Sequence, residues 1–207
     1  MTKEYLTPQE EFWAGEFGTD YATRNVGDRL IASNYHLFSR ILERAQGVES
    51  VLELGANIGL NLRAIHSLLP SAELDAVEIN EAAAGEMTRW GGAKVHLQSL
   101  LEFDARRKWD MTLVKGVLIH ISPEQLARAY DLLHAASRRF ICICEYYNPT
   151  PVAIPYRGHS ERLFKRDFAG EMLDRFPDLD LVDYGFVYHR APVFPMDDIT
   201  WFLLRKK

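Results

Sequence analysis

Residues 51–61 read Val-Leu-Glu-Leu-Gly-Ala-Asn-Ile-Gly-Leu-Asn, and this stretch decides the fold of the chain. A short apolar run contains Glu53, a turn with Gly55 and Gly59 follows, and a helical pattern begins after it. Gly55 can adopt backbone angles that other residues avoid, and Asn57 belongs to the few residue types that tolerate a left-handed conformation. At the end of a parallel strand, such a turn points the first amides of the next helix at a ligand. The pattern predicts a nucleotide-binding turn, with an ordinary glycine turn as the alternative.

The spacing of the turn separates two kinds of nucleotide site. A dinucleotide fingerprint reads Gly-x-Gly-x-x-Gly, whereas this chain reads Glu-x-Gly-x-Asn-x-Gly from Glu53 to Gly59. It resembles the first motif of class I S-adenosylmethionine-dependent methyltransferases, Glu/Asp-x-Gly-x-Gly-x-Gly, with asparagine in place of the middle glycine. S-adenosylmethionine carries no phosphate, so its turn needs room for a methionine moiety more than phosphate-binding amides. The resemblance implies donor contacts from Glu53, Gly55, Ala56, Asn57 and Gly59.

A second acidic residue strengthens this interpretation. Residues 74–79 read as the next strand, and Glu78 stands at its carboxyl end, about 20 residues beyond the turn, where a carboxylate can accept hydrogen bonds from both ribose hydroxyls. A solvated glutamate at a strand end is the alternative. Further donor contacts are expected near the carboxyl ends of the second, third and fourth predicted strands, with simple strand exits as the alternative: Ile79, Ser99, Leu100, Lys115 and Gly116.

Alternation of strands and helices predicts the fold class. Short apolar strands separated by helices imply a parallel sheet with helices on both faces. Two final strands without a helix between them imply an antiparallel hairpin. We therefore predict an α/β, Rossmann-like class I methyltransferase fold: a mostly parallel seven-stranded sheet that ends in a C-terminal antiparallel hairpin. Ligand should sit at the carboxyl ends of strands one, two and four. The strands are expected at 50–54, 73–79, 93–97, 110–118, 139–145, 179–189 and 197–205, and the helices at 28–46, 60–69, 81–90, 122–137 and 165–175.

The 207 residues are expected to form one methyltransferase domain with three parts. An N-terminal flap and helix cover 1–46, a donor-binding core covers 47–145, and a substrate loop, helix and hairpin cover 146–207. Residues 1–26 are predicted to be irregular, but they are too rich in aromatic residues to be disordered, so we expect them to fold over the body as a lid.

Composition and charge narrow the class of protein. The chain is 47% hydrophobic, as in globular proteins. No apolar run can cross a bilayer and no secretory signal is evident, so we expect a cytoplasmic protein with no membrane partner. The net charge of −5 argues against binding to nucleic acid. Cys142 and Cys144 lack metal-site spacing, as do the histidines, so we predict no metal. We expect a monomer or homodimer that acts on a small molecule.

His120 is the candidate catalytic residue. Methyl transfer from a sulfonium is an in-line displacement, so the protein mainly positions two reactants and excludes water. A base helps when the acceptor is a hydroxyl, because it can take the proton. His120 lies where strand four meets the expected site, and histidine has a suitable pKa. The alternative is a histidine that hydrogen-bonds a loop or the substrate without proton transfer.

The stretch 145–159 is dense in tyrosine and proline. Prolines stiffen a loop, and tyrosines combine apolar faces with hydroxyl tips, a surface that suits sugars. Arg157 adds a fork for a carboxylate or a phosphate. A rigid surface connection is the alternative. The predicted substrate-binding residues are Tyr146, Tyr147, Tyr156, Arg157 and His159.

Over nearly its whole length, the chain resembles the pseudaminic acid biosynthesis-associated methylase family. The resemblance rests on residues 12–18 with Tyr21, Arg24 and Asn25, and on 53–61, 115–121, 156–159 and 197–202. It implies an S-adenosylmethionine-dependent methyltransferase linked to bacterial nonulosonic acid sugars, which methylates an oxygen of a small acidic sugar or of its nucleotide-linked form. Arg157 would meet the sugar carboxylate. Tyr21, Arg24 and Asn25 would lie near the methionine end of the donor, with flap packing as the alternative.

Three other functions remain open from the sequence. The same donor can serve another small metabolite that carries a carboxylate or an amine. A nicotinamide-dependent oxidoreductase is disfavoured by the missing Gly-x-Gly-x-x-Gly pattern. A non-catalytic nucleotide-binding protein is the last alternative.

Overall fold

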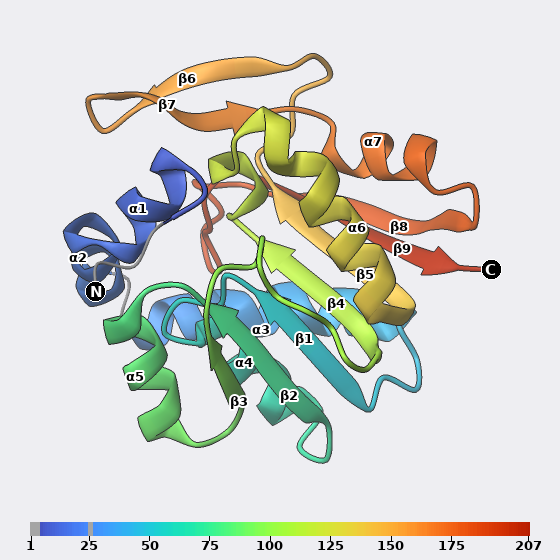
Figure 1. The fold of residues 1–207 in the computed structure, drawn as a ribbon. Helices are drawn as coiled ribbons and strands as arrows, with labels where there is room; N and C mark the ends of the chain where they lie inside the picture. Colours follow the sequence, from blue (N-terminus) through green and yellow to red (C-terminus); the bar gives the residue numbers. More distant parts are fainter. Residues whose placement is uncertain (1–4, 25–26) are drawn as a thin grey trace.

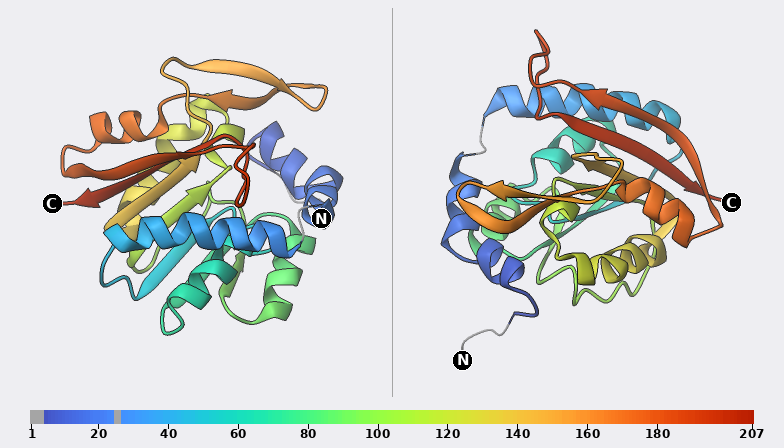
Figure 2. Two further views of the ribbon diagram at one scale, coloured as in Figure 1. Left: turned by 180° about the vertical axis from the view of Figure 1, so that it is seen from behind. Right: turned by 90° about the horizontal axis from the view of Figure 1, so that it is seen from above.

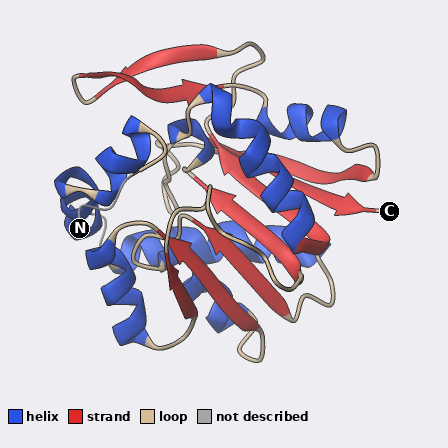
Figure 3. Ribbon diagram, viewed as in Figure 1, coloured by secondary structure: helices blue, strands red, loops and turns tan. Residues whose placement is uncertain are grey.

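A seven-stranded sheet forms the centre of the molecule (Figures 1 and 3). The structure, a computed structural model, describes residues 5–24 and 27–207. The strands lie in the order β3-β2-β1-β4-β5-β9-β8; the first five are parallel, and β9 runs antiparallel to both of its neighbours. This confirms the predicted fold class. The strands are β1 (Ser50–Leu54), β2 (Glu73–Glu78), β3 (Lys94–Leu97), β4 (Trp109–Lys115), β5 (Ser137–Glu145), β8 (Leu179–Val187) and β9 (Ile199–Lys206).

Helices cover both faces of the sheet because its central strands are apolar on both sides. The helices α3 (Asp28–Arg44) and α4 (Leu60–Leu68) pack on one face, and α6 (Leu126–Ala136) and α7 (Phe168–Arg175) pack on the other (Figure 2). The helix α5 (Glu81–Trp90) contributes Met87 to the hydrophobic core on the face of the sheet that α3 and α4 cover. Within the described residues, no helix is both long and apolar enough to cross a membrane.

The N-terminal segment differs from the prediction of irregular structure. It forms two short helices, α1 (Pro8–Ala14) and α2 (Glu16–Arg24). The Thr7 hydroxyl accepts a hydrogen bond from the Glu10 amide at 3.1 Å, and the Glu10 carboxylate accepts one from the Thr7 amide at 3.0 Å. This capping box, with Pro8 at the first helical position, starts α1. The prediction of irregular structure was wrong because this local start signal begins a helix within a segment rich in aromatic residues.

The predicted proline-rich loop is also more regular than expected. It forms a separate two-stranded hairpin of β6 (Val152–Tyr156) and β7 (His159–Lys165), which lies over the rim of the main sheet (Figure 1). Arg157 and Gly158 connect the strands with positive φ angles of 49° and 87°. A two-residue turn with both φ angles positive matches the twist of a hairpin. Pro155 is tolerated because the sheet has only two strands, so each strand is an edge.

Smaller differences occur between β4 and α6. Strand β4 ends at Lys115 rather than at residue 118, because the chain turns into a 3-10 helix, η1 (Leu118–His120). A second 3-10 turn, η2 (Pro123–Gln125), precedes α6, so the Ser122 hydroxyl donates to the Glu124 carboxylate at 2.9 Å instead of capping the helix. The first turn places His120 beside the carboxyl ends of the strands.

Asn80 attaches the two N-terminal helices to the sheet. Its side-chain amide nitrogen lies 3.1–3.3 Å from the carbonyl oxygens of Trp13, Ala14 and Gly15 and from the Thr19 hydroxyl. Its side-chain oxygen accepts from the Ala83 amide at 3.1 Å and caps α5. One buried side chain therefore joins α1 and α2 to the end of β2.

We predict that Asn80→Ala lowers the free energy of unfolding by about 1–3 kcal/mol, because it removes a helix cap and the donor to three partly buried carbonyl groups. Urea unfolding measures this loss, and limited proteolysis reports release of α1 and α2. Asn80→Asp is the matched control, because it keeps the capping oxygen but loses the donor. Equal resistance of all three proteins to proteolysis would contradict this role.

Candidate functional site

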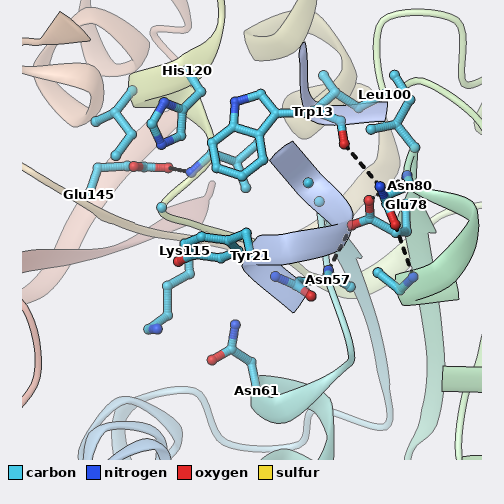
Figure 4. Close-up of a pocket in the computed structure, with 18 of the residues that line it drawn as sticks. Trp13, Tyr21, Asn57, Asn61, Glu78, Asn80, Leu100, Lys115, His120 and Glu145 are labelled. Carbon is cyan, nitrogen blue, oxygen red and sulfur yellow. Dashed lines mark hydrogen bonds between the residues drawn. The ribbon is translucent and has the colours of Figure 1, made fainter. Parts of the chain in front are cut away.

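A cavity of about 690 Å³ opens at the carboxyl ends of β1, β2, β4 and β5. Trp13 of α1 and Tyr21 of α2 line one part of it (Figure 4), and Pro195, Met196 and Asp197 of the loop before β9 line another. It therefore lies where the strand pattern predicts a ligand. The predicted site residues that line it are Tyr21, Gly55, Ala56, Asn57, Glu78, Ile79, Ser99, Leu100, Lys115, Gly116, His120, Tyr146, Tyr156 and Arg157.

The glycine turn has the backbone conformation that its sequence predicts. Gly55, Asn57 and Gly59 have φ angles of 71°, 50° and 79°. A Cβ atom on Gly55 would lie 2.6 Å from Val117 Cγ2, so this glycine allows the loop after β4 to pack against the turn. A Cβ atom on Gly59 would lie 2.8 Å from Met87 Cγ. Gly59 does not line the cavity; it lets α4 approach α5.

Glu78 forms the wall of the cavity beside the turn. Its two carboxylate oxygens accept hydrogen bonds from the amides of Asn57 and Asn80, each at 2.7 Å (Figure 4). Burial raises the pKa of Glu78, and these backbone donors partly oppose that shift. Each oxygen keeps a further lone pair, so the carboxylate can still accept bonds from two ribose hydroxyls.

Glu53 lies behind the cavity wall. It is fully buried, and its Oε1 accepts a hydrogen bond from Asn61 Nδ2 at 2.6 Å. Its Oε2 has no hydrogen-bond partner among the described residues. Burial raises the pKa of Glu53 to about 8, although Asn61 and the nearby positive charge of Lys115 lower it. Asn61 and Lys115 line the cavity, whereas Glu53 does not.

The wall next to β3 is tied to the N-terminal helices. The Ser99 hydroxyl donates a hydrogen bond to the Glu10 carboxylate, and it accepts one from the Leu101 amide at 3.0 Å. Both Ser99 and Glu10 are buried, and both line the cavity beside Leu100. The wall therefore combines an apolar side chain with hydrogen-bonding groups, as a purine needs.

His120 lies on the opposite side of the cavity from Glu78 (Figure 4). Its Nδ1 lies 2.5 Å from the carbonyl oxygen of Arg162. Because a carbonyl can only accept, Nδ1 carries the hydrogen and Nε2 is left as an acceptor. The ring packs against Trp13 and Tyr156, with centroid distances of 4.6 Å and 5.1 Å. Burial lowers the pKa of His120 to about 4, so the ring is neutral at pH 7.

Tyrosines surround the outer part of the cavity. The Tyr146 hydroxyl donates to Asp197 at 3.0 Å. Tyr21 packs edge-on against Trp13, and burial, followed by the charges of Tyr156 and Asp197, raises the pKa of Tyr21 to about 12. Arg157 lines the same region. Aromatic faces, hydroxyl groups and one guanidinium therefore meet at this end.

The structure places several predicted residues elsewhere. Tyr147 is 42% exposed and lies near Phe202, away from the cavity. Arg24 is exposed, with its guanidinium over the ring of Phe17. Asn25 lies outside the described residues. The backbone of His159 pairs with Tyr156 at the start of β7, and its side chain is not described.

The cavity also contains residues that the sequence did not single out. Glu145 ends β5, is 3% exposed, and accepts hydrogen bonds from the amides of Val117 and Leu118 at 2.9 Å and 2.8 Å. Burial raises the pKa of Glu145 to about 7. The rule that identified Glu78, an acidic residue at the end of a parallel strand, would also have identified Glu145. Asp197 and the N-terminal Trp13 gave no such signal, because only the tertiary fold brings them to the cavity.

The described residues contain no group of three His, Cys, Asp or Glu side chains placed to hold a metal ion. Cys142 and Cys144 are buried and free, with their sulfur atoms 3.7 Å apart. The absence of a metal requirement stays a prediction.

Several solved structures with the same architecture are methyltransferases that use S-adenosylmethionine. A methyltransferase of Leishmania major that depends on S-adenosylmethionine is 14% identical, with a TM-score of 0.72 over 96% of this chain and 81% of its own. Magnesium protoporphyrin IX methyltransferase of Synechocystis PCC 6803 with bound S-adenosylhomocysteine is 13% identical, with a TM-score of 0.69 over 96% and 98%. The fold is that of class I S-adenosylmethionine-dependent methyltransferases.

A third similar structure was determined in the presence of the same product. The N-terminal domain of EvdMO1, in the presence of S-adenosylhomocysteine and D-fucose, is 14% identical, with a TM-score of 0.61 over 84% of this chain and 82% of its own. No protein-family model matches the sequence, and no curated protein matches it. The narrower resemblance to the sugar-acid methylases therefore stays an expectation.

We predict that His120 makes the stability of the protein depend on pH. Its pKa is about 4 in the folded chain and 6.5 in the unfolded chain, so between these values the unfolded chain binds the proton more readily. The stability present above pH 6.5 is therefore lost as the pH falls toward 4, by up to about 3 kcal/mol.

Denaturant unfolding of the wild type and of His120→Gln, from pH 4 to 7, measures this contribution as a difference. The variant keeps a hydrogen-bond donor but cannot titrate. Glu53 and Glu145 act with the opposite sign and are present in both proteins, so the comparison removes their effect. Parallel stability curves would show that His120 is not buried as a neutral ring.

Proposed function

We propose that this chain is an S-adenosylmethionine-dependent methyltransferase. The observation that carries the proposal is the position of Glu78 on the wall of the 690 Å³ cavity. Its buried carboxylate accepts a hydrogen bond from the amide of Asn57 in the glycine turn. The fold of the chain adds support, because similar solved structures contain S-adenosylmethionine or its product.

The residues around the turn fit this donor. Asn57 Oδ1, on a residue that lines the cavity, is a buried polar atom without a hydrogen-bond partner among the described residues, and a bound ligand can satisfy it. Glu78 would hold the ribose, Lys115 would meet the methionine carboxylate, and Leu100 would cover the adenine. When bound, the donor supplies a methyl group already activated on a sulfonium, so the chain mainly needs to position the acceptor and exclude water.

We further propose that the acceptor is an oxygen of a small acidic sugar of the nonulosonic acid type, free or nucleotide-linked. The aromatic faces of Trp13, Tyr146 and Tyr156 suit a sugar ring. Arg157 offers the carboxylate a bidentate partner. The EvdMO1 domain, determined in the presence of D-fucose, gives an example of this fold studied with a sugar.

His120 then orients the acceptor hydroxyl. Its Nε2 can accept a hydrogen bond from that hydroxyl, because Nδ1 donates to Arg162. A pKa of about 4 makes the ring a weak proton acceptor, so it would contribute mainly through geometry. Trp13 and Tyr156 keep the ring in place.

An amine-bearing acceptor is the second candidate. Glu145 and Asp197 add negative charge to the same part of the cavity, and carboxylates favour a cationic or hydrogen-donating group. The mass of the product and the position of the new methyl group distinguish the two acceptors.

We predict that Glu78→Ala weakens binding of S-adenosylhomocysteine at least tenfold, which corresponds to about 1.4 kcal/mol. The variant removes two carboxylate acceptors from the ribose. Isothermal titration calorimetry measures the affinity, and circular dichroism checks the fold. Glu73→Ala is the matched control, because Glu73 lies on the same strand but points to solvent. No binding to the wild type would contradict the proposed function.

We predict that Arg157→Ala raises the KM for an acidic sugar acceptor about tenfold and changes kcat less, because the guanidinium binds a carboxylate remote from the reacting oxygen. Formation of S-adenosylhomocysteine is the assay, with the matching neutral sugar as a second acceptor. Arg106→Ala, at an exposed arginine, serves as the control. An equal effect on acidic and neutral acceptors would argue against carboxylate recognition.

A further inference from the structure

Glu145 connects two parts of the cavity wall, the turn that carries His120 and the glycine turn at Gly55. Its Oε1 accepts hydrogen bonds from two successive amides, those of Val117 and Leu118, at 2.9 Å and 2.8 Å. These residues begin the 3-10 turn η1, and the Val117 carbonyl accepts a hydrogen bond from the His120 amide at 2.9 Å. A single buried carboxylate thus holds the start of the turn that carries His120.

The same contact reaches the glycine turn. Val117 packs over Gly55 so closely that a Cβ atom on Gly55 would lie 2.6 Å from Val117 Cγ2. The Gly116 amide donates to the Cys144 carbonyl at 2.9 Å, which holds the other side of the loop. A shift of the Val117 backbone would therefore move the wall against which the glycine turn rests.

We propose that Glu145 is a positioning residue that, in its ionised form, fixes Val117 against Gly55 and thereby makes binding of the methyl donor depend on pH. This inference rests on the proposed function, because the ligand is the same donor. The carboxylate acts through Val117 and Leu118 rather than by contact with the reacting atoms.

Ionisation matters because an ionised carboxylate accepts hydrogen bonds more strongly than a neutral acid. The pKa of Glu145 is raised by burial to about 7, and its backbone donors and the charge of Lys115 on β4 oppose that rise. The other titratable groups that face it are Cys144 on β5 and Tyr130 on α6, while η1 adds His120, which is neutral above pH 5. Protonation near neutral pH should therefore loosen the turn.

Calorimetric titration with S-adenosylhomocysteine between pH 6 and 8 tests the inference. If only the ionised form holds the turn, the wild type should bind about tenfold more weakly at pH 6 than at pH 8. Glu145→Gln keeps an oxygen that accepts from both amides but does not titrate, so its affinity should not change with pH over this range. Glu53→Gln is the matched comparison: it removes another buried acid, which lies behind the cavity wall, and should retain the loss of affinity below pH 7.

S-adenosylmethionine serves as the second ligand, because it carries the sulfonium charge that the product lacks. Positioning through Val117 predicts that Glu145→Gln changes the affinity for both ligands equally. A much larger loss for S-adenosylmethionine would mean that the charge of Glu145 acts directly on the donor, and would overturn the inference. A flat pH profile in the wild type would overturn it as well.

The wild type alone provides a further test, in case the variant does not fold. Amide hydrogen exchange of Val117 and Leu118, corrected for the intrinsic effect of pH, should lose protection as the pH falls below 7. Unchanged protection would overturn the inference. Failure of the wild type to bind either ligand at any pH would instead overturn the proposed function, so the two failures are distinguishable.

Discussion

The burial of carboxylates at the ends of parallel strands is the constraint on which the site depends. Glu53, Glu78 and Glu145 end or nearly end β1, β2 and β5, and burial raises the pKa of each. A buried carboxylate is unfavourable unless hydrogen-bond donors compensate for the lost water. Here the donors are amides of the loops that surround the cavity, together with Asn61. The acids therefore hold those loops in place, and Glu78 and Glu145 also line the cavity.

The N-terminal helices complete the cavity by the same kind of interaction. Glu10 accepts from Ser99 after β3, and Asn80 after β2 donates to the backbone where α1 meets α2. These contacts bring Trp13 and Tyr21 over the cavity beside His120. Enclosure by aromatic side chains excludes water and lowers the local dielectric. That environment strengthens the electrostatic contacts within the site and lowers the pKa of the histidine.

Many residues of the proposed donor site, around the glycine turn and the end of β2, were predictable because their sequence signals are local. The glycine turn at 55–59 needs particular backbone angles, and the acid at the end of β2 follows from strand position alone. The proposed acceptor site, with its tyrosines and Arg157, was predictable only in part. Tyr146, Tyr156 and Arg157 reach the cavity, whereas Tyr147, one residue along the chain, faces outward. Neighbouring residues of an extended segment point to opposite sides, and the loop sequence does not say which side faces the site.

By itself, the sequence determined the order of the strands of the main sheet and of the helices between them, the left-handed glycine turn and the position of the acid on β2, because hydrophobic periodicity and backbone sterics act over a few residues. The tertiary structure decided which distant segments meet: α1 over His120, the β6–β7 hairpin over the rim, and Glu145 against the turn at Val117. These contacts join residues far apart along the chain. Their formation depends on packing and on the compensation of buried polar groups, neither of which a local pattern records.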